Sequence, residues 1–266
     1  MKTLQQYINE WKASVNTTKF IRDNYCRLTY RIDSEDGIKI FDPSWPLFNE
    51  FKNRVYINNE RIIIDDSGCT HEEYKPGTYY VEIKGVNDIT NCVCMFDGCT
   101  QLIELSLFDT SKVKSMYGMF LGCENLKNVP LFNTSKVNNM WGMFAGCKKL
   151  KIIPLLDTMN VVNMVGTFEK CESIEEIPKL NTSNVISMYS LFKNCKKLKK
   201  IPLLNTPNIQ RIHEMFYGCT NLEDVPLFDI HNVEDADEMF YGCNNLNDET
   251  KKEWSQIYDF RTHHKI

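Results

Sequence analysis

The stretch Met119-Phe120-Leu121-Gly122-Cys123 returns 24 residues later as Met143-Phe144-Ala145-Gly146-Cys147, and related pentads recur at this spacing from Met95 to Cys243. No insertion breaks the register of the two columns formed by Phe96, Phe120, Phe144, Phe168, Phe192, Phe216 and Phe240, and by Cys99, Cys123, Cys147, Cys171, Cys195, Cys219 and Cys243. A unit this short cannot bury its own apolar face, so it stacks on its neighbours. The spacing predicts a solenoid of six or seven coils over residues 86–247.

A single coil contains two patterns. Val137, Met140 and Phe144 have the spacing of one helical face, and Gly146 is a residue suited to end a helix. The apolar residues that follow predict a short buried strand, carried by Leu150, Ile153 and Leu155. Each coil is therefore expected to combine a short helix with a narrow strand, which makes the fold class an α/β repeat.

The repeat Val-x-x-Met-x-x-Met-Phe-x-Gly-Cys-x-x-Leu-x-x-Ile-Pro-Leu-x-Asn-Thr-Ser, read from residues 113 to 207, resembles the BspA-like branch of leucine-rich repeat proteins. It is similar to the shorter bacterial surface-protein repeat found in adhesins and lipoproteins. The resemblance covers about residues 86–247 and departs locally, for example at Lys170 and Asn194, which replace glycine. It implies a right-handed solenoid with a narrow parallel sheet on one face and short helices on the other. For function it implies adhesion or protein recognition.

The first 85 residues do not follow the period. Leu4, Tyr7, Ile8 and Trp11 indicate an amphipathic helix, and alternating segments predict strands over 25–32, 38–41, 54–57, 61–64 and 78–83. Asn58-Asn59 and Asp36-Gly37 are suited to hairpin turns. Residues 1–85 are expected to form a mainly β domain with a leading helix that caps the solenoid.

The last residues also leave the period. Residues 248–260 predict a helix whose Trp254, Ile257 and Tyr258 cover the last coil. The remaining tail is polar, and its His263 and His264 are interpreted as solvated. Residues 248–266 are therefore assigned to a capping helix and a tail.

Composition excludes several classes of protein. The chain is 42% hydrophobic and 25% charged, as expected of a folded protein, and its net charge of -4 lacks the basic excess that nucleic acid selects. No apolar run is long enough to span a bilayer, and no apolar leader follows Met1. We expect no membrane insertion and a cytoplasmic location, or a virion if the gene belongs to a phage, with the cell surface reached only by a non-standard export route.

Cysteines and histidines do not form a recognisable reactive site. Seven of the 11 cysteines share one repeat column, which predicts a row of buried, reduced thiols. Cys92, Cys94 and Cys99 lack the second ligand pair that a zinc site needs. No catalytic constellation or nucleotide-binding loop is found, so we expect no cofactor, no metal and no enzymatic activity.

Charged residues alternate between coils. One column contains Lys151, Glu175, Lys199 and Glu223, and another contains Glu124, Lys148, Glu172 and Lys196. Equivalent side chains on stacked coils are close enough to pair. This pattern predicts register specification by cross-coil ion pairs; the alternative is a striped face that binds a mixed-charge partner.

An aromatic column lies one residue past the inner methionine of each repeat. It contains Tyr117, Trp141, Tyr189 and His213, with Val165 interrupting it, and Tyr217 and Tyr241 add aromatic rings near the C-terminal end. One interpretation is half-buried packing at the flank of each coil. The other is a row of anchors at an interface, where Trp and Tyr commonly dominate affinity.

These observations favour a non-enzymatic scaffold for protein recognition or adhesion, with a protein or a glycan as partner. The candidate contacts are the four residues of the aromatic column together with Tyr217 and Tyr241. The alternative is a structural component of a phage virion or tail. Oligomeric assembly through the N-terminal domain is compatible with both functions.

Overall fold

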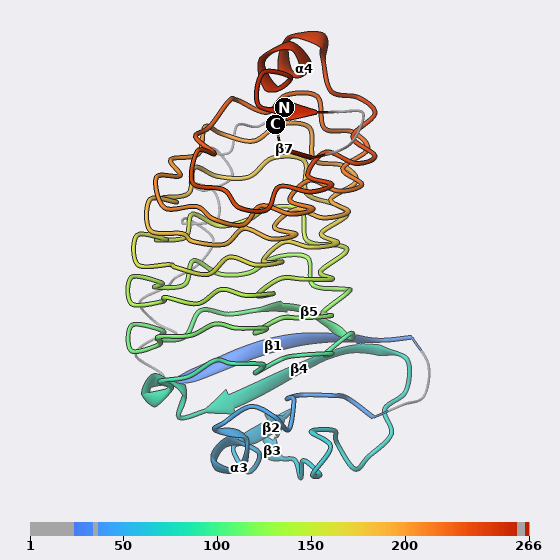
Figure 1. Ribbon diagram of the computed structural model, residues 1–266. Helices are drawn as coiled ribbons and strands as arrows, with labels where there is room; N and C mark the ends of the chain where they lie inside the picture. The colour runs from blue at the N-terminus through green and yellow to red at the C-terminus, as the bar shows by residue number, and fades with distance from the viewer. Residues whose placement is uncertain (1–23, 34–36, 260–263, 266) are drawn as a thin grey trace.

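The computed structural model describes residues 24–33, 37–259 and 264–265, and it places a stack of coils on an N-terminal sheet (Figure 1). The chain starts this described part at the sheet and ends at the far end of the stack, beside a short helix. The predicted leading helix and Asp36 of one predicted turn lie outside the described residues.

The N-terminal sheet is antiparallel, with strand order β3-β2-β4-β1-β5. Its strands are β1 (Tyr25–Ile32), β2 (Val55–Ile57), β3 (Glu60–Arg61), β4 (Gly77–Lys84) and β5 (Leu102–Leu105). The predicted strands over 25–32, 54–57 and 78–83 are confirmed. Asn58 and Asn59 have φ of 52° and 67°, the left-handed region that a tight hairpin between β2 and β3 requires.

Two predicted strands in this region are wrong. Residues 38–41 and 61–64 provide only the isolated bridges Lys39–Cys69 and Ile64–Thr70 beyond the two residues of β3. The chain instead turns through helix α3 (Phe48–Phe51), whose Phe48 and Phe51 are buried. Alternation of apolar residues was present, but no neighbouring strand was available to pair with it.

The sheet covers the open end of the solenoid. Strand β1 pairs with β4 on one side and with β5 on the other, in the register Leu28–Leu105. Strand β5 follows η1 (Val86–Asp88) and already belongs to the first coil. Backbone groups that would be exposed at the edge of the first coil are therefore paired. The predicted boundary at residue 85 stays a prediction.

The coils stack in parallel with a spacing of one repeat. Isolated parallel bridges connect one position of each coil to the next, through Ser115, Asn139, Asn163, Ser187, Arg211 and Asp235. A second column contributes the bridge Lys200–Asp224. Stacked coils of one repeat length are thus observed, whereas extended strands between residues 106 and 247 are not.

The predicted short helices are wrong. Residues 89–247, all described, contain no α-helix. In each coil two positions four residues apart have left-handed backbone, as at Gly118 (φ 58°) and Gly122 (φ 71°). Left-handed residues interrupt an α-helix, so the segment folds into successive turns.

Backbone hydrogen bonds explain why this geometry is retained. The amide of Met119 closes a turn on the Met116 carbonyl at 3.2 Å, whereas the Gly118 amide donates to Trp141 of the next coil at 2.8 Å. Turn bonds and cross-coil bonds therefore satisfy the backbone together. Stacking maintains the left-handed conformation even where glycine is absent, as at Lys170, Ser190, Asn194, Glu214 and Glu238.

The core of the solenoid is a stack of phenylalanine rings. The seven column phenylalanines are buried, their successive ring centroids lie 5.5 to 5.9 Å apart, and the interplanar angles are 15° or less. This spacing falls in the range of favourable aromatic pairs. We call this stack the phenylalanine spine.

The seven column cysteines are buried and free, as predicted. Six of them also donate a hydrogen bond from Sγ to the phenylalanine carbonyl of the preceding coil, at 2.9 to 3.2 Å, in Cys123, Cys147, Cys171, Cys195, Cys219 and Cys243. Burial raises the pKa of these thiols, to about 12 for Cys243. The column thus connects adjacent coils as well as filling space.

The C-terminal segment closes the spine. Helix α4 spans Asp248–Trp254, shorter than the predicted 248–260, and is followed by β6 (Tyr258–Asp259) and β7 (His264–Lys265). Asn247 caps the helix by accepting a hydrogen bond from the Thr250 amide at 2.7 Å. Trp254 and Tyr258 lie edge-on to Phe240, at 5.2 and 5.4 Å, and cover the last ring as predicted.

Candidate functional site

The six candidate aromatic residues form three stacked pairs, two in the column of Tyr117 and one, Tyr217–Tyr241, in the column four residues later. Their ring centroids lie 4.5 Å apart in Tyr117–Trp141, 5.3 Å in Tyr189–His213 and 5.0 Å in Tyr217–Tyr241, with interplanar angles of 10°, 11° and 16°. We call these six residues the aromatic face. Each pair joins consecutive coils, so the 24-residue spacing places the rings in contact.

The backbone holds the aromatic face in place. The carbonyl groups of Trp141, Tyr189, His213 and Tyr241 each accept a cross-coil hydrogen bond at 2.8 or 2.9 Å. Side chains on such a ladder project from a fixed backbone. An interface built on them would need little reordering on binding.

The six side chains of the aromatic face differ in their exposure to solvent. Tyr189 is 39% exposed and Tyr241 is 47% exposed, whereas Tyr117, Trp141, His213 and Tyr217 are half-buried. Packing at the flank of the coils accounts for much of the surface of the half-buried residues. The exposed rings Tyr189 and Tyr241 are therefore the stronger candidates for contact with a partner.

An ion pair connects the two C-terminal pairs. Lys193 lies 4.9 Å from the centre of the Tyr217 ring and donates to Glu214 at 2.6 Å, and Ser190 also donates to Glu214, at 3.1 Å. Burial opposes the charge on Glu214, but these hydrogen bonds outweigh it and hold the pKa of its carboxyl below the usual value. The hydrogen bond to Glu214 likewise outweighs burial at Lys193 and raises the pKa of its ammonium group.

A second polar group lies beside His213. Its Nδ1 is 3.2 Å from Asp235 Oδ1. Asp237 adds a carboxylate oxygen, and one ligand atom from each of the three residues lies within 4.8 Å of the other two. These three residues could hold a metal ion, although the hydrogen bond between His213 and Asp235 already accounts for their proximity. The expectation that the protein uses no metal or cofactor stays a prediction, as does the absence of catalysis.

The charge ladder forms ion pairs between coils. Lys148 pairs with Glu124 at 2.7 Å, and Lys196 pairs with Glu172 at 3.0 Å. In the other column Lys199 lies 3.9 Å from Glu175. These distances confirm cross-coil pairing at the three positions.

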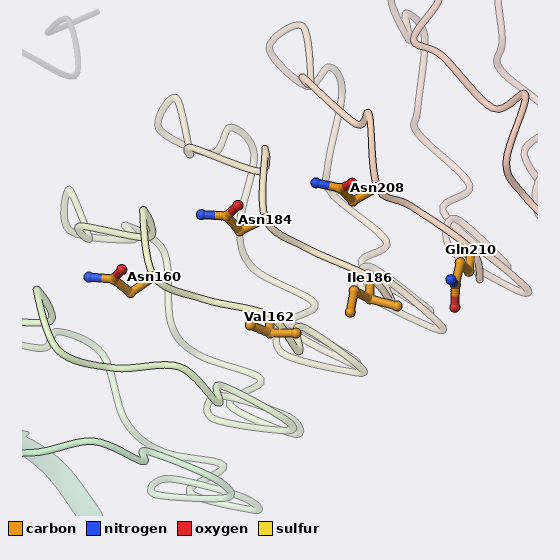
Figure 2. Close-up of a pocket in the computed structure, with 6 residues that line it drawn as sticks. All are labelled: Asn160, Val162, Asn184, Ile186, Asn208 and Gln210. Atoms are coloured by element: carbon orange, nitrogen blue, oxygen red, sulfur yellow. The ribbon is translucent and has the colours of Figure 1, made fainter.

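The sequence did not predict two surface features of the middle coils, an exposed leucine and a groove. Leu155, predicted to lie in a buried strand, is 52% exposed, because the next residue, Leu156, points into the core instead. A groove of about 400 Å³ lies on the same coils and is lined by Asn160, Val162, Asn184, Ile186, Asn208 and Gln210 (Figure 2). Comparing residues 24 apart would have found the groove, since each wall is one repeat column.

The described residues include no helix with the length and apolar character that crossing a membrane would require.

The chain is similar to one solved structure and to one protein family. A search of curated proteins found no match. A leucine-rich repeat protein of T. pallidum, solved by crystallography, is similar over 64% of this chain and 84% of its own, with 20% sequence identity and a TM-score of 0.36. A family profile described as "Mycoplasma protein of unknown function, DUF285" matches residues 81–176 and 151–254. These matches together span 174 of the 266 residues, from 81 to 254. The chain therefore belongs to the DUF285 family.

Proposed function

We propose that this chain is a non-enzymatic scaffold that recognises a protein partner through the aromatic face. The observation that carries the proposal is the partial exposure of Tyr189 and Tyr241 on a backbone fixed by cross-coil hydrogen bonds. Tyrosine and tryptophan supply much of the affinity at protein interfaces because large, stiff rings lose little entropy on binding.

Stacking within the pairs favours a protein over a glycan as partner. Each ring covers one face of its neighbour, as Tyr217 and Tyr241 do at 5.0 Å. Fewer open ring faces are then left for a sugar to stack on. Ring edges and tyrosine hydroxyls remain suited to side chains and peptide groups.

The charge around the exposed rings indicates the partner's chemistry. Lys193 is neutralised by Glu214. Asp235, Asp237 and Glu238 bring three negative charges to the next coils, against the positive charge of Arg211. Arginine suits such a surface because its guanidinium group binds carboxylates and stacks on aromatic rings. We therefore infer a partner that presents arginine or lysine.

A cross-linking experiment tests this proposal. A photo-activatable residue is placed at Tyr241 in one variant and at Leu203, which is 61% exposed and lies outside the aromatic face, in a matched control. In extracts of the source cells, the Tyr241 variant should give a discrete protein adduct that the control does not. Equal adducts at both positions, or adducts at Leu203 alone, would reject the aromatic face as the binding surface.

A role as a structural component of a phage virion or tail is the alternative. It predicts that the protein sediments with large particles in those extracts. An adhesive role would place the partner on another cell or matrix. Identification of the Tyr241 adduct separates these three functions.

A further inference from the structure

One exposed column of the solenoid has a self-complementary order. The first coil has Thr90 at this position, outside the ladder of hydrogen bonds that links the other six coils. The members of the column in those six consecutive coils are Lys114, Asn138, Val162, Ile186, Gln210 and Glu234. All six are exposed, with Val162 at 39% and Ile186 at 40%. Read from either end, the column runs from a charge through an amide to an apolar centre, and the two end charges are opposite. We call it the palindromic column.

Backbone hydrogen bonds keep this column straight. The amide of each member donates to the carbonyl of the member one coil earlier, at 2.8 to 3.0 Å from Asn138 through Glu234. Five spacings of about 4.8 Å give the column a length of about 24 Å. Its side chains are therefore held at regular positions on a rigid support.

The column borders the groove shown in Figure 2. Asn160, Asn184 and Asn208 form the second wall, and each donates from Nδ2 to a carbonyl of the preceding coil at 2.7 or 2.8 Å. These bonds fix the orientation of the amides. Among the residues that the structure describes, no donor reaches their Oδ1 atoms, which remain able to accept a hydrogen bond.

The two end charges are also available. Neither Lys114 nor Glu234 has an ion-pair partner within the described parts of the chain. Lysine and glutamate on exposed surfaces commonly stay solvated, so this alone would carry no conclusion. Their placement at opposite ends of one apolar and amide strip is what needs an explanation.

We propose that a second copy of this chain docks on the palindromic column in the antiparallel direction. A two-fold axis between Val162 and Ile186 places Lys114 of one copy against Glu234 of the other. The same axis places Asn138 against Gln210 and Val162 against Ile186. A two-fold interface requires a surface that complements itself, and this column has that property.

The order of charges also selects the direction of docking. A parallel arrangement of two copies would place lysine on lysine and glutamate on glutamate, which disfavours it. A partner of unrelated sequence would not require the column to be complementary to itself when it is read in the opposite direction. The palindromic column is a single row of side chains, so it covers a smaller area than a standard interface of about 800 Å² per partner. The dimer is therefore weak and reversible.

The test is a charge-reversal cycle measured by sedimentation of the full chain over a range of concentrations. Wild type should form a concentration-dependent dimer. Lys114→Glu and Glu234→Lys should each weaken it at least tenfold, because both ends of the interface then meet like charge. The double variant Lys114→Glu/Glu234→Lys should recover the wild-type dissociation constant within about threefold, since the column is again self-complementary. An equal mixture of the two single variants should form a heterodimer for the same reason.

Glu223→Lys is the matched control, because it makes the same change of charge at an exposed position outside the column. It should leave the dimer unchanged, and cooperative thermal unfolding of every variant would establish that they fold. The proposal is overturned if wild type stays monomeric, if the double variant does not recover, or if Glu223→Lys weakens association as strongly as Glu234→Lys. A complex with a different protein that survives both single reversals would likewise assign the groove to another occupant.

Discussion

The phenylalanine spine and the column of the aromatic face that begins at Tyr117 occupy two positions of the same repeat, yet they differ in composition. Phenylalanine occupies the spine position in all seven coils. The outer column instead changes from coil to coil, through Tyr117, Trp141, Val165, Tyr189 and His213. A ring between two coils must match both neighbours, but an outward side chain meets solvent on one side. The comparison indicates that interior columns specify the fold and that exterior columns are free to specify a partner.

The largest expected effect concerns the buried thiols. Burial raises the pKa of the seven column cysteines above the ordinary value of 9.0. The folded state then keeps protons that the unfolded state releases, so stability is constant below about pH 9 and falls above it. Above about pH 9, each thiol can lower the free energy of unfolding by up to about 1.4 kcal/mol per pH unit. The loss from seven thiols over one pH unit is comparable to a typical total stability of about 5 to 15 kcal/mol.

Urea denaturation between about pH 7 and about pH 10 measures this loss. A triple variant with alanine at Cys147, Cys171 and Cys195 should show a shallower decline, because three titrating groups are removed. An equally steep decline in that variant would assign the pH dependence to other groups.

Truncation of the phenylalanine spine should have the next largest effect. Phe144→Ala removes a fully buried ring that lies between Phe120 and Phe168, at 5.7 and 5.9 Å. A cavity of this kind costs about 3 to 5 kcal/mol of unfolding free energy. The exposed control Leu203→Ala should change stability by about 0.5 kcal/mol or less. Similar costs for both variants in denaturant melts would remove the distinction between interior and exterior columns.

The charge ladder gives the smallest effect on stability. Glu175→Lys places a lysine between Lys151 and Lys199, and exposed pairs of this kind contribute about 0.2 to 1 kcal/mol. Salt should reduce the loss, and adding Lys199→Glu should recover part of it. An unchanged denaturation midpoint for Glu175→Lys at low salt would show that the alternation does not contribute to register.

Periodicity was sufficient to predict the stacked coils, the buried Phe and Cys columns and the strand over 25–32. It was misleading for the helices, because Val137, Met140 and Phe144 face inward at helical spacing while Gly142 and Gly146 adopt left-handed backbone. Cross-coil hydrogen bonds impose that conformation, and a pattern within one repeat cannot reveal them. The same limit explains Leu155, whose orientation depends on how the neighbouring coils pack.

All six residues of the aromatic face were predicted from the sequence, but their difference in exposure was not. Tyr189 and Tyr241 are exposed whereas the other four rings are half-buried, a difference that the repeat spacing does not encode. The ion pair between Lys193 and Glu214 joins residues 21 positions apart, so it does not follow the 24-residue period. Columns read one at a time could not have revealed it.

Affinity for the partner identified by cross-linking at Tyr241 is the most direct test of recognition through the aromatic face. Tyr241→Ala should weaken binding by at least tenfold, or about 1.4 kcal/mol, with little change in thermal stability. Trp141→Ala, at a half-buried ring stacked on Tyr117, should lower stability, and it should lose about 2 kcal/mol or more of binding if the whole aromatic face contacts the partner. Full affinity in both variants would contradict recognition through the aromatic face and assign its rings to packing of the coils.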